Sequence, residues 1–200
     1  MQEEWVMKNI LLSIFLVGAS VSSFAEAPFG LKVGMSLAEV KKVSGPAEVL
    51  EKNYYSFKNV PIPYKGFKDY LMVITPKSGL CKVLGFGNPI TTSVYGDGVK
   101  AEFSTLKESL IKKYGKPIGD YDFLRAGSIW KNPNEWMMSL YREERILTAA
   151  WEPKEDNGVE NIMLKARATG RSTGVITLSY ELSNNEACLA EKESRDISGL

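Results

Sequence analysis

The side chains best suited to chemistry in this sequence are acidic pairs, a few aromatic residues and two cysteines, because none of its 200 residues is histidine. Histidine is the commonest general base and the commonest metal ligand in proteins. Its absence favours a protein without an active site. We therefore expect no catalytic residues, no metal site and no cofactor.

Two acidic pairs are the remaining candidates for acid–base chemistry. Asp120 and Asp122 follow a predicted helix end, and Glu143 and Glu144 lie between two predicted strands. Paired carboxylates could serve a hydrolase as acid and base. The simpler interpretation is that residues 119–122 form a turn with solvated acids and that Glu143 and Glu144 lie at a hairpin tip.

Cys81 and Cys188 are the only cysteines. An isolated pair in an exported chain usually indicates one structural disulfide. A catalytic pair would need Cys-x-x-Cys spacing or a histidine partner. A bridge closing a loop of roughly 100 residues contributes on the order of 4 kcal/mol in the chain-entropy model. It would attach the C-terminal segment to an interior strand.

Three aromatic residues are the candidate binding residues. Trp130 and Trp136 flank a polar segment containing Asn132, Pro133 and Asn134, and Tyr64 lies in a proline-containing loop at residues 59–66. If these rings face solvent, they resemble the anchors of protein interfaces, since Trp and Tyr offer a large contact area at low entropic cost. The alternative is that both tryptophans point inward at strand ends.

The first 25 residues are typical of an export signal. Lys8 precedes an apolar run at residues 10–19, and small residues follow it. The run is too short to span a bilayer in the mature protein. Cleavage is expected after Ala25 or Ala27, and Pro28 disfavours the second position. We expect a periplasmic protein with no integral membrane segment.

The composition is that of a globular protein without a strong charge bias. With 25 basic and 24 acidic residues, the chain offers no large basic surface for nucleic acid. Its 44% hydrophobic content is sufficient for one domain or two small ones. The expected partner is another exported or envelope protein.

Two helices are predicted from their ends and their periodicity. Ser36 and Glu39 form a capping box, and Gly45 with Pro46 ends that helix. The second helix covers residues 99–114, where apolar residues recur at spacings of three and four. Gly115 and Pro117 end it in a similar way.

Alternating or apolar segments between turn residues predict the strands. They are expected at residues 54–58, 67–75, 80–86, 127–130, 136–141, 146–151, 159–168 and 174–183. Strands consecutive in sequence tend to pair, so a largely antiparallel sheet is expected. The polar segment from Asn184 is expected to be loosely held except at Cys188.

The two halves of the chain share a pattern of a helix ended by Gly and Pro, then strands with a Pro-Lys turn that closes on glycine. This pattern predicts an α+β fold made of two tandem units, residues 26–98 and 99–183, followed by a tail at 184–200. Each unit would be a helix with an antiparallel meander. The helices would cover one face of the sheet.

The motif of residues 34–46, with Gly34-Met35-Ser36, Glu39-Val40 and Gly45-Pro46, supports a family resemblance. It resembles the opening motif of the SmpA/OmlA-type outer-membrane lipoproteins and of the β-lactamase-inhibitory-protein fold. The resemblance implies a small periplasmic protein-binding module, and the second fold occurs as a tandem repeat.

Three functions remain open from the sequence. The first is a non-catalytic exported protein that binds another protein, as an inhibitor, an immunity protein or an envelope scaffold. The second is a carrier of a small ligand or lipid on the concave face of the sheet. The third is a hydrolase that uses Asp120 and Asp122.

Overall fold

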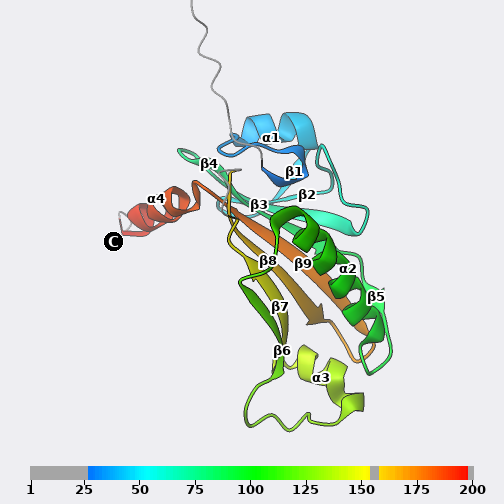
Figure 1. Ribbon diagram of the computed structural model, residues 1–200. Helices are drawn as coiled ribbons and strands as arrows, with labels where there is room; N and C mark the ends of the chain where they lie inside the picture. Colours follow the sequence, from blue (N-terminus) through cyan, green and yellow to red (C-terminus); the bar gives the residue numbers. More distant parts are fainter. Residues whose placement is uncertain (1–26, 154–157, 198–200) are drawn as a thin grey trace, which may run out of the picture.

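The computed structural model describes residues 27–153 and 158–197. The expected signal segment, residues 1–25, lies outside the described residues. The described chain has an α+β fold with four α-helices and an antiparallel sheet of nine strands (Figure 1). The expected α+β class and antiparallel sheet are confirmed.

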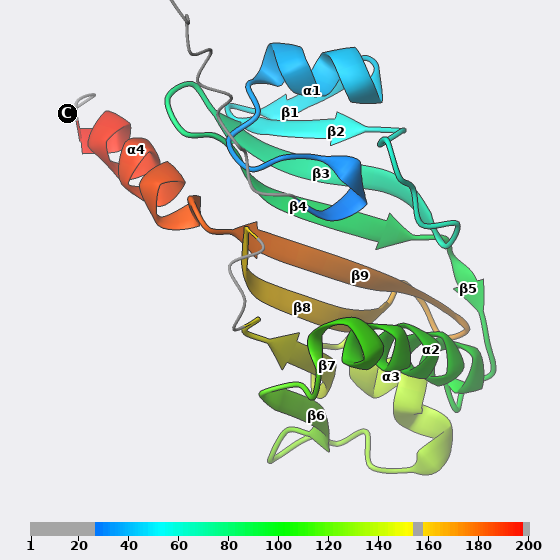
Figure 2. The ribbon, with the colours of Figure 1, turned by 45° about the horizontal axis from the view of Figure 1, so that its top comes forward.

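The order of the main strands across the sheet is β1-β2-β3-β4-β9-β8-β7-β6, and the short β5 pairs with β9 (Figure 2). Every pairing is antiparallel. The strands are β1 (Ala47–Glu51), β2 (Tyr54–Phe57), β3 (Phe67–Thr75), β4 (Gly79–Gly87), β5 (Ile90–Thr91), β6 (Gly119–Leu124), β7 (Arg145–Trp151), β8 (Val159–Ala168) and β9 (Thr173–Leu182).

Along the chain, one helix precedes each group of four long strands. The helix α1 (Leu37–Ser44) comes before β1–β4, and α2 (Asp97–Tyr114) comes before β6–β9. The last strands of the two groups, β4 and β9, pair in the middle of the sheet. The remaining helices are α3 (Trp136–Tyr141) and α4 (Asn185–Ile197), with 3-10 turns at Pro28–Gly30 and Pro133–Glu135.

The predicted ends of α1 and the predicted glycine end of α2 are confirmed, whereas α2 begins at Asp97, two residues before the predicted start. The amide N–H of Glu39 donates to Ser36 Oγ at 3.3 Å, and the Glu39 carboxylate accepts from the Ser36 N–H at 2.8 Å. This reciprocal pair satisfies donors that the first turn leaves unpaired. Gly45 and Gly115 follow α1 and α2 with φ of 83° and 81°. Glycine takes this left-handed conformation without a Cβ clash.

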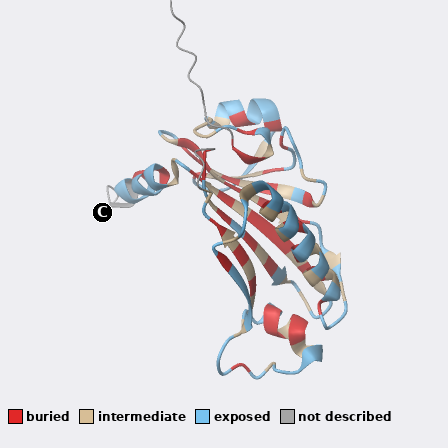
Figure 3. Ribbon diagram, in the orientation of Figure 1, coloured by how far each residue is buried: buried red, intermediate tan, exposed pale blue. Residues whose placement is uncertain are grey.

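The hydrophobic core lies between the sheet and the helices α1, α2 and α3. From the helices, Val40, Phe103, Leu110 and Met137 are buried in it. The strands β8 and β9 contribute every second residue, and Figure 3 shows buried residues alternating along these strands. The buried residues that alternate along these strands are Ile162, Leu164, Ala166, Ile176, Leu178, Tyr180 and Leu182.

The helix α4 lies on the opposite side of the sheet. The ring of Tyr180 on β9 faces Tyr114 of α2, with ring centroids 6.4 Å apart. Its neighbour Glu181 points the other way and lines a groove with Leu189 of α4. We call the α1–α3 side the core face and the α4 side the open face. The expectation that the helices cover one face is therefore wrong for α4.

The segment between β6 and β7 also differs from the prediction. Residues 127–130 are irregular, and the expected strand at 136–141 is the helix α3. Trp136, Met137 and Leu140 are buried there, at a spacing that fits one side of a helix. A capping box between Asn132 and Glu135 precedes it. The apolar run was too short for its period to separate helix from strand.

Three further expectations about elements are corrected. The expected turn at residues 119–122 is part of the edge strand β6, and a strand not predicted, β1, follows α1 directly. The expected loose tail is the helix α4. Its polar composition gave no sign of a buried side, because Cys188 and Glu191 are the only buried residues among the α4 side chains that the structure describes.

Candidate functional site

The open face presents the strand residues that alternate with the core residues. The strand register aligns these residues into rows that cross the sheet. One row contains Tyr54, Val73, Lys82 and Glu181, and the next contains Ser56, Leu71, Leu84, Ser179 and Met163. Side chains in such rows contact their cross-strand neighbours, so each row acts as a continuous strip of surface.

A groove of about 330 Å³ lies where α4 crosses these rows. We call it the α4 groove. Its floor contains the aliphatic side chains of Leu71, Val73 and Leu84, and α4 forms one wall with Leu189 and Lys192. The full lining is Asn53, Tyr54, Leu71, Val73, Thr75, Lys82, Leu84, Glu181, Asn185, Cys188, Leu189 and Lys192.

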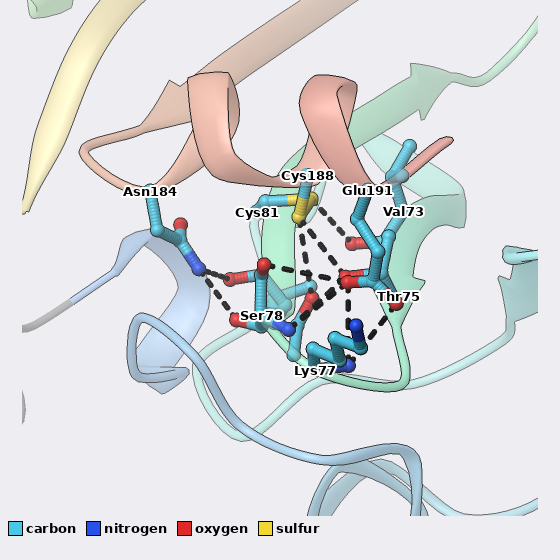
Figure 4. The surroundings of a disulfide bond; sticks show 10 residues. Val73, Thr75, Lys77, Ser78, Cys81, Asn184, Cys188 and Glu191 are labelled. Atoms are coloured by element: carbon cyan, nitrogen blue, oxygen red, sulfur yellow. Dashed lines mark hydrogen bonds between the residues drawn. A yellow bond between two sulfur atoms is a disulfide. The ribbon is translucent and has the colours of Figure 1, made fainter. Parts of the chain in front are cut away.

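The predicted disulfide between Cys81 and Cys188 is confirmed, and it attaches α4 to β4 (Figure 4). In the β3–β4 pair, Val73 is opposite Lys82 and Ile74 is opposite Leu80, so Cys81 is an extra residue. Such a bulge changes the direction of a side chain. The bulge thus presents a buried cysteine to a helix on the open face.

Polar contacts hold α4 beside the disulfide (Figure 4). The carboxylate of Glu191, which is 8% exposed, accepts the backbone N–H groups of Lys77 and Ser78, each at 3.2 Å. The side-chain amide of Asn184 donates to the carbonyls of Ser78 at 2.7 Å and Leu80 at 3.1 Å. These bonds satisfy backbone groups of the β3–β4 turn, so they fix the position of α4.

The charged groups of the α4 groove differ between its two ends. Near β9, the ammonium of Lys82 lies 2.7 Å from the carboxylate of Glu181. Near β2, the ammonium of Lys192 donates to the phenol oxygen of Tyr54 at 3.1 Å and lies 5.0 Å from the centre of its ring. The β9 end therefore carries an ion pair, and the β2 end carries an ammonium in contact with a phenol.

A second apolar region lies on the open face at the other side of the sheet. Tyr121 and Phe123 of the edge strand β6 are 50% and 48% exposed, and their rings are in edge-to-face contact at 6.3 Å. Met163 on β8 is 47% exposed. Half-buried Ile146 and Thr148 of β7 lie opposite Phe123 and Tyr121 in the register. We call these five residues the β6–β8 patch.

The acidic pair at Asp120 and Asp122 is engaged in ion pairs. Asp120 lies 3.0 Å from the ammonium of Lys107 on α2, and Asp122 lies 2.7 Å from the guanidinium of Arg145 on β7. The two aspartates alternate with Tyr121 and therefore face the core side of β6. Their contacts join the edge strand to its neighbours. The arrangement gives both carboxylates a structural role.

The second acidic pair lies in the turn that joins α3 to β7. Glu143 has a positive φ of 57° and lies 3.5 Å from Arg167 of β8. The N–H of Glu144 donates to the carbonyl of Ser139 at 2.9 Å. The expected hairpin tip is therefore wrong, because the element before the pair is the helix α3 and not a strand.

Trp136 and Trp130 lie in the segment between β6 and β7. Trp136 is 6% exposed, and the ammonium of Lys100 lies 4.5 Å from its ring. Trp136 is thus a core residue and does not present its ring to solvent. Trp130 is half-buried, and its backbone N–H donates to Ser128 Oγ at 3.2 Å.

Tyr64 lies in the loop between β2 and β3 and is also half-buried. Its ring is 5.1 Å from that of Phe67, and its backbone N–H donates to the hydroxyl of Tyr70 at 3.3 Å. Burial, with a smaller contribution from Glu102, raises the pKa of Tyr64 above its ordinary value of 10.0. Tyr64 thus contacts residues of β3, whereas Trp136 contacts Lys100 of α2, so the two rings lie in different parts of the structure.

The sequence predicted neither the α4 groove nor the β6–β8 patch. The alternation of acids with aromatics in residues 120–123 could have indicated a strand with an apolar side. The spacing of three between Cys188 and Glu191 could have indicated a helix. The α4 groove had no local signal, because its residues come from five separate elements or their ends.

Comparisons with known proteins gave no match: no family model fits the chain, and no similar curated protein or solved structure was found. In the part of the chain that the structure describes, no helix is long and apolar enough to cross a membrane. The same residues contain no group of three or more His, Cys, Asp or Glu side chains arranged to hold a metal ion.

Proposed function

We propose that this chain is an exported, non-catalytic module that binds another exported or envelope protein, as an inhibitor, an immunity protein or a scaffold. The observation that carries the proposal is the β6–β8 patch. Tyr121 and Phe123 on β6 and Met163 on β8 expose about half of their surface on one sheet face, on the two strands that flank β7. Exposed apolar side chains that gather on one surface are typical of interaction sites.

The composition of the patch favours a protein partner. Tyrosine, phenylalanine and methionine are enriched at the centres of protein interfaces. They lie on paired strands, so little side-chain and backbone entropy would be lost when a partner covers them. Lys165 of β8, which is opposite Thr148 in the register, adds a positive charge beside the apolar centre.

Export is part of the same proposal. The disulfide between Cys81 and Cys188 is of the kind that persists in oxidising compartments. The apolar segment at residues 10–19 supplies the expected signal, and a periplasmic location accounts for both features.

We also propose that residues 26–98 and 99–183 are tandem units. The supporting observations are the order of one helix before each group of four long strands and the similar glycine ends of α1 and α2. Pairing of β4 with β9 would then join the two units into one sheet.

Site-specific photo-crosslinking in the native envelope tests the binding proposal. A benzophenone amino acid at Tyr121 or Met163 should give a discrete protein adduct. The same group at Lys112, which is exposed on α2 at the core-face side, is the matched control. The variant Phe123→Ala, combined with the Met163 probe, should reduce the adduct several-fold. Equal adducts at Tyr121 and Lys112, or none at either patch position, would contradict the proposal.

A further inference from the structure

A small pocket lies beside α2, apart from the α4 groove and the β6–β8 patch. Its volume is about 190 Å³. This is below the range of roughly 300–1,000 Å³ that is usual for drug-sized ligands, so the pocket fits a group of few heavy atoms. We call it the α2 pocket. The side chains that line it are those of Phe67, Asn88, Ile90, Glu102, Leu106 and Ile176.

Most of these side chains are apolar. Phe67 of β3, Leu106 of α2 and Ile176 of β9 are buried members of the hydrophobic core, and Ile90 of β5 is half-buried. An inorganic cation such as Mg²⁺ or Ca²⁺ requires several oxygen ligands, which this lining does not supply. The lining therefore favours an organic ligand with a short hydrocarbon part.

Glu102 is the only charged residue among the described residues that line the α2 pocket, and it is half-buried. Within the described chain, its carboxylate forms no ion pair and no hydrogen bond. Lys65 is exposed and is not paired with it. The positions three and four residues away on α2 are uncharged: Gly98, Val99, Thr105 and Leu106. The charge of Glu102 is therefore available to a ligand.

The Glu102 carboxylate points from α2 toward the start of β3. A Cβ placed on Gly66 would lie 3.5 Å from Glu102 Oε1 and 2.5 Å from the ring of Tyr64. Burial, with a smaller contribution from Glu102, raises the pKa of Tyr64, as expected for a phenol near this carboxylate. The carboxylate thus faces Gly66, whose backbone also lines the α2 pocket.

Asn88 supplies a second hydrogen-bond acceptor. Its backbone N–H donates to the carbonyl of Gly66 at 2.9 Å, and its side-chain amide donates to the same carbonyl at 3.3 Å. The side-chain carbonyl oxygen of Asn88 is left to accept a hydrogen bond from a ligand. Because Glu102 also only accepts, the complementary group is a cation with several N–H donors. A primary ammonium, which has three donors, has this chemistry.

We propose that the α2 pocket binds the ammonium group and short aliphatic chain of a primary amine. The ammonium lies between the Glu102 carboxylate and the Asn88 carbonyl oxygen. The chain lies against Leu106 and Ile176. Free alkylamines and lysine side chains both carry this group, so the pocket recognises a chemistry that the two sources share. The site is independent of the β6–β8 patch.

An NMR titration of the isotope-labelled protein with butylammonium chloride tests the proposal. We expect saturable shifts of the Gly66, Gly87 and Asn88 amides, with a dissociation constant below about 10 mM. Butanol and pentanoate are matched probes, since they carry the same four-carbon chain on other head groups. Butanol should bind at least about five-fold more weakly, because it lacks the charge-assisted contact. Pentanoate should give no saturable shift, because Glu102 repels it.

Variants on α2 test the role of Glu102. Glu102→Gln keeps the shape of the side chain and should weaken butylammonium binding about five- to ten-fold, with little change for butanol. Glu108→Gln is the matched control, because Glu108 is exposed on the same helix and lies outside the pocket lining. It should leave the affinity unchanged. The amide spectrum of each variant shows whether its fold is retained.

A lysine derivative distinguishes the two sources of the amine. If Nα-acetyl-lysine N-methylamide binds at least as tightly as butylammonium, the ligand is a lysine side chain of a protein. Weaker binding assigns the pocket to a free amine.

The proposal would be overturned by no saturable shift with butylammonium, by equal affinity for pentanoate, or by unchanged affinity in Glu102→Gln. Phe123→Ala alters the β6–β8 patch and should leave butylammonium binding unchanged. Failure of either proposal is thereby separated from failure of the other.

Discussion

Cys188 is bonded to Cys81, the extra residue of the bulge in β4, across a sequence separation of 107 residues. This bond places α4 on the face of the sheet opposite the other three helices of the described chain. The disulfide, with the contacts of Glu191 and Asn184, holds α4 over one part of the open face, and the β6–β8 patch lies at the other side of the sheet.

Removing the disulfide should destabilise the protein and release α4. We expect the variant Cys81→Ser, Cys188→Ser to lose about 3–5 kcal/mol of unfolding free energy, because the bond restricts a long loop in the unfolded chain. Urea denaturation measures this loss. Hydrogen exchange should show α4 amides losing protection before those of β8 and β9. Retained protection in α4 would show that Glu191 and Asn184 hold the helix without the bond.

Two glycines with positive φ should respond differently to alanine. A Cβ at Gly79, where φ is +67°, would lie 2.0 Å from the carbonyl oxygen of Gly34, whereas at Gly45, with φ of +83°, it meets no atom within 4 Å. Gly45→Ala should cost about 1–3 kcal/mol, which is the cost of placing a Cβ at this positive φ alone. Gly79→Ala should cost more, because the β3–β4 turn must move away from the segment before α1. Equal losses in thermal denaturation would contradict this account.

The capping box of α1 should make part of its stability pH-dependent. Hydrogen bonds from the Ser36 side chain and backbone lower the pKa of Glu39 below its ordinary value of 4.5. A lowered folded-state pKa gives a stabilisation that is present above pH 4.5 and is lost as the pH falls through the folded-state value. Ser36→Ala should move the Glu39 pKa toward 4.5 in an NMR titration and cost about 1 kcal/mol at neutral pH from loss of the cap.

The stability difference between the wild type and Ser36→Ala should become smaller in acid. The other capping box, in which the Glu135 carboxylate accepts hydrogen bonds from Asn132, is not altered by the substitution and serves as an internal structural control. A stability difference that is constant from pH 7 to pH 3 would contradict the proposed link to Glu39.

The expected export signal should be removed after Ala25. Ala27 is 8% exposed in the folded core, and its backbone N–H donates to the carbonyl of Leu31 at 2.9 Å. The following Phe29 packs edge-to-face on Tyr70 and Tyr180. A cut after Ala27 would remove this residue from the core and would require cleavage before Pro28. The intact mass of protein purified from the periplasm distinguishes a first residue of Glu26 from one of Pro28.

The sequence was informative where the signals were local. The capping box at Ser36 and Glu39 was predicted correctly, because its two residues lie within one turn of helix. The strands β3 and β8 were predicted with their observed ends, since strict alternation and flanking turns define a strand without knowledge of its neighbours. The disulfide also followed from the sequence, because two cysteines permit a single intramolecular pair.

The errors occurred where distant parts of the chain decide the local structure. The segment at residues 136–141 is too short for a reliable period, and its helix is set by burial of Trp136 and Met137 against the sheet. The helix α4 has few apolar residues, and its structure depends on bonds from Glu191 to the β3–β4 turn. Neither contact can be read from neighbouring residues alone.

The sequence by itself determined the class of fold, the ends of α1, the glycine end of α2, the alternation of β8 and β9, and the pairing of Cys81 with Cys188. The tertiary structure alone decided the candidate sites. Strand register places Leu71, Leu84 and Met163 in one row, and a single bulge presents Cys81 to α4 on the open face. Register and bulges arise from pairing between strands far apart in the chain, and therefore no local pattern of residue types specifies them.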